Sequence, residues 1–132
     1  MRFALVLFAA GLTACVASRP AAPSGPIDAR VVLAPGETAD IAPANIRVRF
    51  QGVLSDSRCP ADVLCIQQGE AIVRIDIVAS GGAPSTFDLH TGDTKPVRHH
   101  ELSFSLENLS PYPFSSRTIA SGDYRATLRV VR

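Results

Sequence analysis

Hydrophobic and polar residues alternate one by one along much of this 132-residue chain. Between residues 46 and 51, apolar side chains occupy the even positions and polar side chains the odd ones. The same pattern runs through residues 71–77, 102–107 and 124–130. Successive side chains of a β-strand point to opposite faces, so a strand with one face on the core produces this period of two. No stretch after residue 15 has a helical period, and we predict an all-β fold.

Turn-forming residues separate the alternating stretches. Glycine, proline and aspartate gather at residues 34–38, 80–84, 91–94 and 121–123, and these residue types accept the dihedral angles of turns. Short strands at such separations are typical of antiparallel sandwiches and small barrels, and we predict one of about seven strands. The expected strands are residues 29–33, 37–41, 45–54, 69–79, 85–91, 96–107 and 122–131.

The beginning of the chain has the pattern of an export signal. Arg2 provides a positive charge, and the apolar run from Phe3 to Leu12 follows it. A run of this length is typical of a secretory signal and is too short for a permanent membrane helix. We therefore predict that residues 1–14 form a signal peptide and that the mature protein is exported.

The segment Leu12-Thr13-Ala14-Cys15 resembles the lipobox of bacterial lipoproteins. The resemblance covers the first fifteen residues and implies that Cys15 carries a diacylglycerol after cleavage just before it. Two or three acyl chains are enough for stable membrane anchoring. Val16 stands where an inner-membrane retention signal has aspartate, so the resemblance implies an outer-membrane lipoprotein facing the periplasm. A plain secretory signal is the alternative.

A proline- and alanine-rich segment, residues 15–27, joins this cysteine to the first expected strand. Its prolines favour an extended polyproline conformation, and twelve residues at about 3.1 Å each span roughly 35 Å. We predict a tether here and one β domain over residues 28–132.

Charge gives little indication of a polyanionic partner. The chain has 13 Lys and Arg residues and 12 Asp and Glu residues, and loss of Arg2 with the signal makes the two numbers equal. A neutral chain without a basic stripe is not typical of a nucleic-acid-binding protein. We therefore expect the membrane, through the lipid, and an envelope protein or polymer as partners, and no nucleic acid.

Cys59 and Cys65 lie in the segment SDSRCPADVLC, residues 55–65. Assigning Cys15 to lipid leaves these two as a pair, and exported proteins oxidise such pairs. Their spacing matches neither a zinc site with paired ligands nor a redox C-x-x-C motif. We predict a disulfide-closed loop, with metal binding and a nucleophilic cysteine as alternatives.

The closed loop raises the question of what it presents. Arg58 and Asp62 flank it or lie within it, and both are candidates for a partner-binding surface. The alternative is a structural corner in which Arg58 pairs with a nearby acid, and this is the alternative we favour. The apolar residues Val63 and Leu64 are expected to fold back onto the core.

A second candidate binding segment is SPYPFSS, residues 110–116. Two prolines bracket Tyr112, and Phe114 follows directly. Aromatic side chains held by a stiff backbone are common at protein-binding surfaces. Tyr112 and Phe114 are therefore candidates for that surface, and closure of an open end of the sandwich is the equal alternative.

The segments SDSRCPADVLC, Gly69-Glu70-Ala71 and Leu109 to Pro113, with the final strand containing Tyr124, resemble a group of small uncharacterised bacterial secreted proteins and lipoproteins. This resemblance spans most of the domain. It implies a single β domain closed by a disulfide and implies no activity.

The histidines are weak candidates for metal ligands. His99 and His100 are expected to point to opposite faces of one strand, and His90 to approach one of them across a hairpin. With Asp88 or Glu101, such a group would suit zinc or copper. Solvated surface histidines are the favoured alternative, and we expect no cofactor.

The motifs G-x-S-x-G and H-E-x-x-H do not occur. We therefore expect a non-enzymatic envelope lipoprotein whose domain binds a partner through loops at one end of the sandwich. A metal-binding or metal-delivery lipoprotein is one alternative function. A small envelope hydrolase, or an inhibitor of one, is another.

Overall fold

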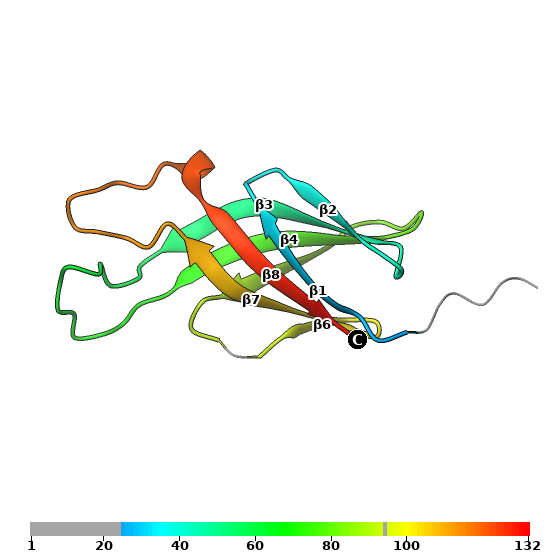
Figure 1. Cartoon of the computed structure of the whole chain (residues 1–132). Helices are drawn as coiled ribbons and strands as arrows, with labels where there is room; N and C mark the ends of the chain where they lie inside the picture. The colour runs from blue at the N-terminus through cyan, green and yellow to red at the C-terminus, as the bar shows by residue number, and fades with distance from the viewer. Residues whose placement is uncertain (1–24, 94) are drawn as a thin grey trace, which may run out of the picture.

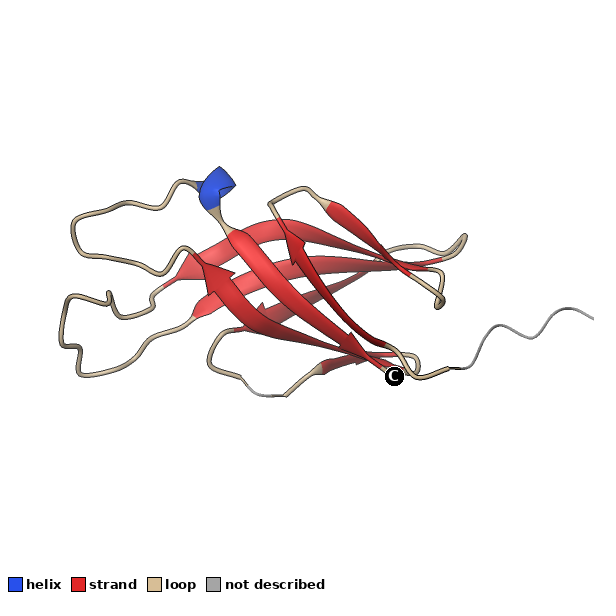
Figure 2. Cartoon of the chain, viewed as in Figure 1, coloured by secondary structure: helices blue, strands red, loops and turns tan. Residues whose placement is uncertain are grey.

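The computed structural model describes residues 25–93 and 95–132, and these residues form eight strands and one short 3-10 turn (Figures 1 and 2). The expected signal peptide, Cys15 and most of the tether lie outside the described residues. The elements are β1 (Asp28–Leu33), β2 (Thr38–Ile41), β3 (Ile46–Asp56), β4 (Ala71–Ala79), β5 (Ser85–His90), β6 (Val97–His99), β7 (Leu102–Ser110), η1 (Ser121–Asp123) and β8 (Arg125–Val131). No helix in the described part of the chain is long and apolar enough to cross a membrane.

The strands form two antiparallel sheets of four strands each, with the orders β1-β8-β7-β6 and β2-β3-β4-β5. The apolar residues of both sheets form one buried cluster, which confirms the predicted all-β fold and fits the sandwich of the two predicted architectures. Phe50 and Ile75 from one sheet, and Phe104 and Leu128 from the other, are fully buried. Burial of each such side chain contributes about 1.5–3 kcal/mol relative to exposure.

The expected strand 96–107 is two strands in the structure. His100 has a positive φ of 54°, and the chain reverses through His100 and Glu101 so that His99 pairs with Leu102. Non-glycine residues at positive φ are uncommon, and this turn has no glycine or proline to indicate it. The prediction of about seven strands therefore missed one strand boundary.

The two ends of the sandwich carry different parts of the chain. At one end, Asp28 of β1 pairs with Val131 of β8, so the tether would leave from this base end (Figure 1). At the opposite end lie two long connections, residues 57–70 between β3 and β4 and residues 111–120 after β7. We call them the stapled loop and the proline-aromatic loop, and together they form the loop end.

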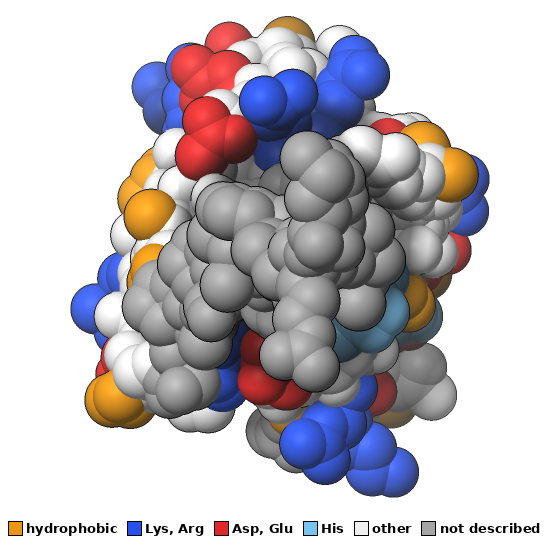
Figure 3. Space-filling model, turned by 90° about the vertical axis from the view of Figure 1, so that its right-hand side faces the viewer, with side chains coloured by type: hydrophobic (Ala, Val, Ile, Leu, Met, Phe, Trp, Pro, Cys, Tyr) orange, Lys and Arg blue, Asp and Glu red, His pale blue; other side chains and the backbone are white. Residues whose placement is uncertain are grey.

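Charged side chains of both signs are mixed on the base end, which faces the viewer in Figure 3. On the outer face of one sheet, ion pairs join Asp28 to Arg129 at 2.8 Å and Arg30 to Glu107. On the other sheet, Arg74 and Asp88 pair at 2.8 Å. These pairs occupy the polar positions of the alternating pattern, and they are exposed pairs of small energetic weight.

Candidate functional site

A disulfide joins Cys59 and Cys65 in the stapled loop, with the two Cα atoms 6.0 Å apart. This confirms the predicted disulfide-closed loop. Because each sulfur is bonded to the other, neither cysteine is a free thiolate for metal binding or nucleophilic attack. The alternatives of a metal site or a nucleophilic cysteine at these two positions are therefore wrong.

The base of the stapled loop is a narrow backbone ladder. The Ser57 amide donates to the Glu70 carbonyl at 2.8 Å, and the Cys59 amide donates to the Gln68 carbonyl at 2.7 Å. Between these bonds lies Gly69, with a φ of 64°, where a Cβ atom would come within 1.7 Å of the Ser57 carbonyl oxygen. Only glycine allows the two arms of the loop to approach this closely.

Arg58 lies inside this loop base and not on the surface, with a relative exposure of 8%. Its Nε and Nη2 donate to the two carboxylate oxygens of Asp56 at 2.8 and 2.6 Å. Its guanidinium also donates to the backbone carbonyls of Leu109 at 2.7 Å and Pro111 at 3.1 Å. The candidate role of Arg58 as an exposed binding residue is wrong, because its donors face these internal acceptors. It forms the structural corner that was the favoured alternative.

The electrostatics of this corner favour the charged forms. Burial alone would raise the pKa of the Asp56 carboxyl, but hydrogen bonds from Arg58 and from the Tyr124 hydroxyl hold that pKa below its usual range. The hydrogen bond to Asp56 raises the pKa of Arg58. The Tyr124 hydroxyl donates to Asp56 at 3.0 Å. The ion pair is therefore well satisfied by additional hydrogen bonds, as a buried pair requires.

The two loops of the loop end are joined directly. The Ala61 amide donates to the Pro113 carbonyl at 2.9 Å. The Ser115 amide donates to Asp62 at 2.8 Å, and the Ser115 hydroxyl also donates to the same carboxylate. The hydroxyl bond is the main cause that lowers the pKa of Asp62. Asp62 is exposed, as a surface candidate should be, but its carboxylate holds the neighbouring loop in place.

Tyr112 and Phe114 are about half exposed, at 48% and 46%. Both line a cavity of about 330 Å³ within the proline-aromatic loop. The Arg58 Cζ lies 5.2 Å from the centroid of the Tyr112 ring, within the range of a cation–π contact. About half of each aromatic residue is therefore covered by the loop end, and the other half is accessible to solvent.

The most exposed apolar side chains are Leu64 and Ile66, which are fully exposed at 101% and 105%. Val63 beside them is 45% exposed. The expectation that Val63 and Leu64 fold back onto the core is wrong, because Leu64 is fully exposed, Val63 is 45% exposed, and neither belongs to the buried core cluster. Ile66 was not among the predicted site residues. It follows Cys65 directly, and an apolar residue next to a closed loop was the available signal.

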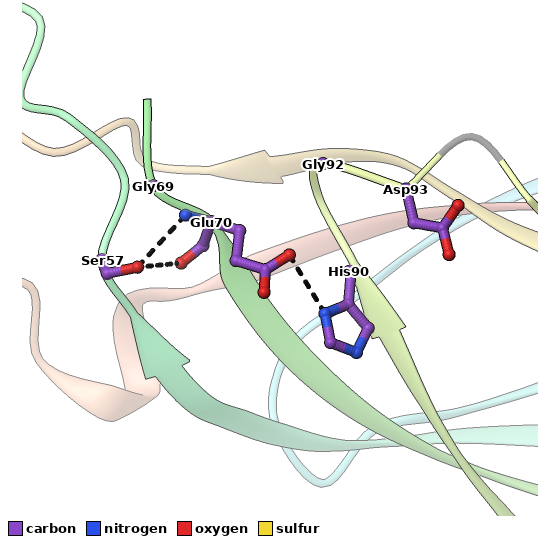
Figure 4. Close-up of a pocket in the computed structure, with 6 residues that line it drawn as sticks. All are labelled: Ser57, Gly69, Glu70, His90, Gly92 and Asp93. Carbon is purple, nitrogen blue, oxygen red and sulfur yellow. Dashed lines mark hydrogen bonds and ion pairs between the residues drawn. The ribbon is translucent and has the colours of Figure 1, made fainter. Parts of the chain in front are cut away.

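An open pocket of about 580 Å³ lies beside the base of the stapled loop. It is lined by Ser57, Gly69, Glu70, His90, Gly92 and Asp93 (Figure 4). His90 Nδ1 is 3.1 Å from Glu70 Oε2. The Ser57 hydroxyl donates to the Glu70 carbonyl and accepts from the Glu70 amide, so backbone bonds occupy it.

This pocket does not have the arrangement of a serine hydrolase. In Figure 4 the His90 ring interacts with the Glu70 carboxylate and the Ser57 hydroxyl with the backbone. A general base must reach the hydroxyl it activates, and no hydrogen bond joins these two side chains among the described residues. Ser57, Glu70 and Asp93 were not predicted as site residues, because they meet only in the folded chain.

The three histidines do not meet as expected. β5, which contains His90, lies in one sheet, and β6, which contains His99, lies in the other. His99 and His100 do not point to opposite faces, since their rings are 4.4 Å apart across the turn. Burial is the main cause that lowers the pKa of His99, and the charge of His100 lowers it further. Within residues 25–93 and 95–132, no three His, Cys, Asp or Glu side chains are arranged to hold a metal ion.

Comparisons with known proteins add no assignment to this geometry. No protein-family profile, no curated protein sequence and no solved structure matches the chain significantly.

Proposed function

We propose that this protein is a lipid-anchored lipoprotein of the bacterial envelope whose β domain is a non-catalytic binding module. The domain binds an envelope partner through its loop end. Its lipid is attached to Cys15, and the tether sets the distance over which the domain can search. Anchoring confines the domain to a thin layer at the membrane, which raises its effective concentration for a partner there.

The observation that supports binding at the loop end is the full exposure of Leu64 and Ile66. Leu64 lies within the ring closed by the disulfide and Ile66 directly follows it, and Asp62 fixes this loop to the neighbouring one. Exposed apolar side chains that gather in one place often mark interaction sites. A loop that is already ordered loses little conformational entropy on binding, which favours affinity.

The cysteine content supports the lipid anchor. The chain has three cysteines, and two of them are bonded to each other. Cys15 is then the remaining cysteine of an exported chain, at the position where a lipobox has its lipidated residue. Val16 supports the outer membrane as the destination, with the domain facing the periplasm.

The anchor is tested by labelling cells with a radioactive or alkyne-bearing fatty acid. The wild-type chain should incorporate label and sediment with membranes, and Cys15→Ser should lose both properties. The double variant Cys59→Ser/Cys65→Ser is the matched control and should keep both. Label on Cys15→Ser, or membrane sedimentation without label, would contradict the anchor.

Binding at the loop end is tested by photo-crosslinking in the native host. A photo-reactive amino acid replaces exposed Gln67 of the stapled loop, and in a second strain it replaces exposed Ala83 in the turn between β4 and β5 at the base end. A discrete adduct from the Gln67 position and none from Ala83 is the expected result. Adducts from Ala83 alone would place binding at the other end.

A further inference from the structure

We propose that Leu64 and Ile66 insert into an apolar cleft of a protein partner, which lies farther from the anchoring membrane than the domain itself. This inference rests on the proposed function and identifies the class of partner for the loop end. It concerns these two aliphatic side chains and not the half-exposed aromatic pair of the proline-aromatic loop.

The shape and polarity of the stapled loop indicate an apolar, concave partner. Residues 63–69 contain no charged side chain, and Leu64 and Ile66 are as exposed as in an extended peptide. The ladder between Cys59 and Gln68 and the bonds to Asp62 fix the direction in which this segment projects. Two aliphatic side chains on a rigid, convex tip lose water fully only when a cleft surrounds them.

The charges of the loop end do not favour a lipid surface. Residues 57–70 and 111–120 contain two basic residues, Arg58 and Arg117. The Arg58 guanidinium is buried and bonded to Asp56, so Arg117 is the only exposed cation of these two described loops. Membrane-binding loops and segments commonly add several basic residues that attract anionic headgroups. This loop end lacks that set.

The tether leaves the domain at the end opposite to the loop end. Twelve residues from Val16 to Ile27 reach about 40 Å at most when fully extended. The eleven-residue strand β3 alone spans about 36 Å between the base end and the loop end. Because the tether leaves from the base end, a domain that stands upright on the membrane presents its tip to a partner beyond it.

A second copy of the chain is a poor fit for the same tip. Two convex tips that meet end to end bury little area, whereas stable interfaces bury about 800 Å² on each partner. A cleft in another protein can contact the sides of the loop as well as Leu64 and Ile66. The polar side chains of Gln67 and Gln68 would then lie at the rim of that contact.

The test uses the full chain in its native host, with the photo-reactive residue at Gln67 and mass spectrometry of the adduct. We expect one protein adduct whose crosslinked peptide lines an apolar cleft. The double variant Leu64→Ser/Ile66→Ser should reduce the adduct yield at least tenfold, because burial of each side chain contributes about tenfold or more to affinity. Val32→Ser, which changes an exposed aliphatic residue of β1, is the matched control and should leave the yield unchanged.

The outcomes separate this inference from the proposed function. An adduct that persists in the Leu64→Ser/Ile66→Ser variant would overturn the inference and leave binding at the loop end intact. A phospholipid adduct would identify a membrane target, and an adduct with the same chain would identify self-association; either overturns the inference. A second probe is placed at Phe114. If export and the disulfide are verified, the absence of an adduct from both Gln67 and Phe114 would overturn both proposals.

Discussion

Arg58 and Asp56 face each other in the interior of the loop end through two parallel hydrogen bonds of 2.8 and 2.6 Å. Their side chains are 6% and 11% exposed. The remaining donors of Arg58 reach Leu109 and Pro111, which belong to a distant part of the chain. This pair therefore connects the end of β3 to the end of β7 and supports both loops at once.

Replacement of Arg58 should destabilise the domain strongly. Arg58→Ala leaves the Asp56 carboxylate buried without its cation, and we expect a loss of about 3–5 kcal/mol in the free energy of unfolding. Urea denaturation measures the loss. Arg47→Ala, which removes an exposed pair with Asp40, is the control and should cost about 0–1 kcal/mol. Equal losses for the two variants would contradict an internal role for Arg58.

The same pair should make the domain sensitive to acid. The pKa of Asp56 is lowered in the folded state, so the folded protein binds this proton less readily than the unfolded chain does. The ionised Asp56 carboxylate therefore stabilises the folded state. Its contribution to the free energy of unfolding is complete above the pKa of the unfolded chain, about 3.9, and is lost as the pH falls through the lower pKa of the folded state.

Urea unfolding at a series of pH values checks this dependence. The free energy of unfolding should fall below about pH 4 in the wild type. Asp56→Asn should be less stable at neutral pH and should show a weaker decline in acid. An Asp56→Asn profile parallel to that of the wild type would assign the acid sensitivity to other carboxylates.

The disulfide should contribute measurably to stability although its loop lies outside the core. By the chain-entropy relation, closing the seven residues from Cys59 to Cys65 contributes about 2.4 kcal/mol. The double variant Cys59→Ser/Cys65→Ser should remain folded, because the core residues belong to the strands, and should unfold at lower urea concentration. Leu64→Ser keeps the bridge and should unfold like the wild type. An unchanged midpoint in the double cysteine variant would refute the contribution.

Gly69 should tolerate no side chain. Its positive φ and the 1.7 Å approach of a Cβ atom to the Ser57 carbonyl mean that Gly69→Ala must open the loop base. We expect a loss of at least about 3 kcal/mol. Gly82→Ala, where the nearest atom would lie at 3.4 Å, should be close to neutral. Thermal unfolding of the two variants makes the comparison, and equal melting temperatures would argue against the ladder.

Tyr112 should have a modest effect on stability. Its ring lies over the Arg58 guanidinium, and a contact of this kind contributes about 0.5–2 kcal/mol. Tyr112→Ala should therefore cost about 1 kcal/mol in chemical denaturation. Phe114→Ala, which removes a similarly exposed ring, is the companion variant and should cost less. A loss above about 3 kcal/mol for Tyr112→Ala would place the ring in the core instead.

The local sequence determined the faces of the strands and the pairing of the cysteines. Alternation specifies which side chains of a strand point inward, because successive Cβ atoms leave opposite faces. Ile46, Val48 and Phe50 of β3 are accordingly buried. Parity and spacing were enough to predict the Cys59–Cys65 bond, since a short exported loop with two cysteines oxidises.

The tertiary structure alone decided the character of the loop end. Arg58 is buried because its acceptors come from residues 51 and 53 positions farther along the chain, and no local pattern brings those carbonyls to it. Leu64 and Ile66 are fully exposed although they are aliphatic, because no other segment in the described part of the chain covers them. His100 breaks an alternating run through a single positive φ. The burial of Arg58 depends on contacts between distant segments, whereas the strands depend on a period that neighbouring residues already contain.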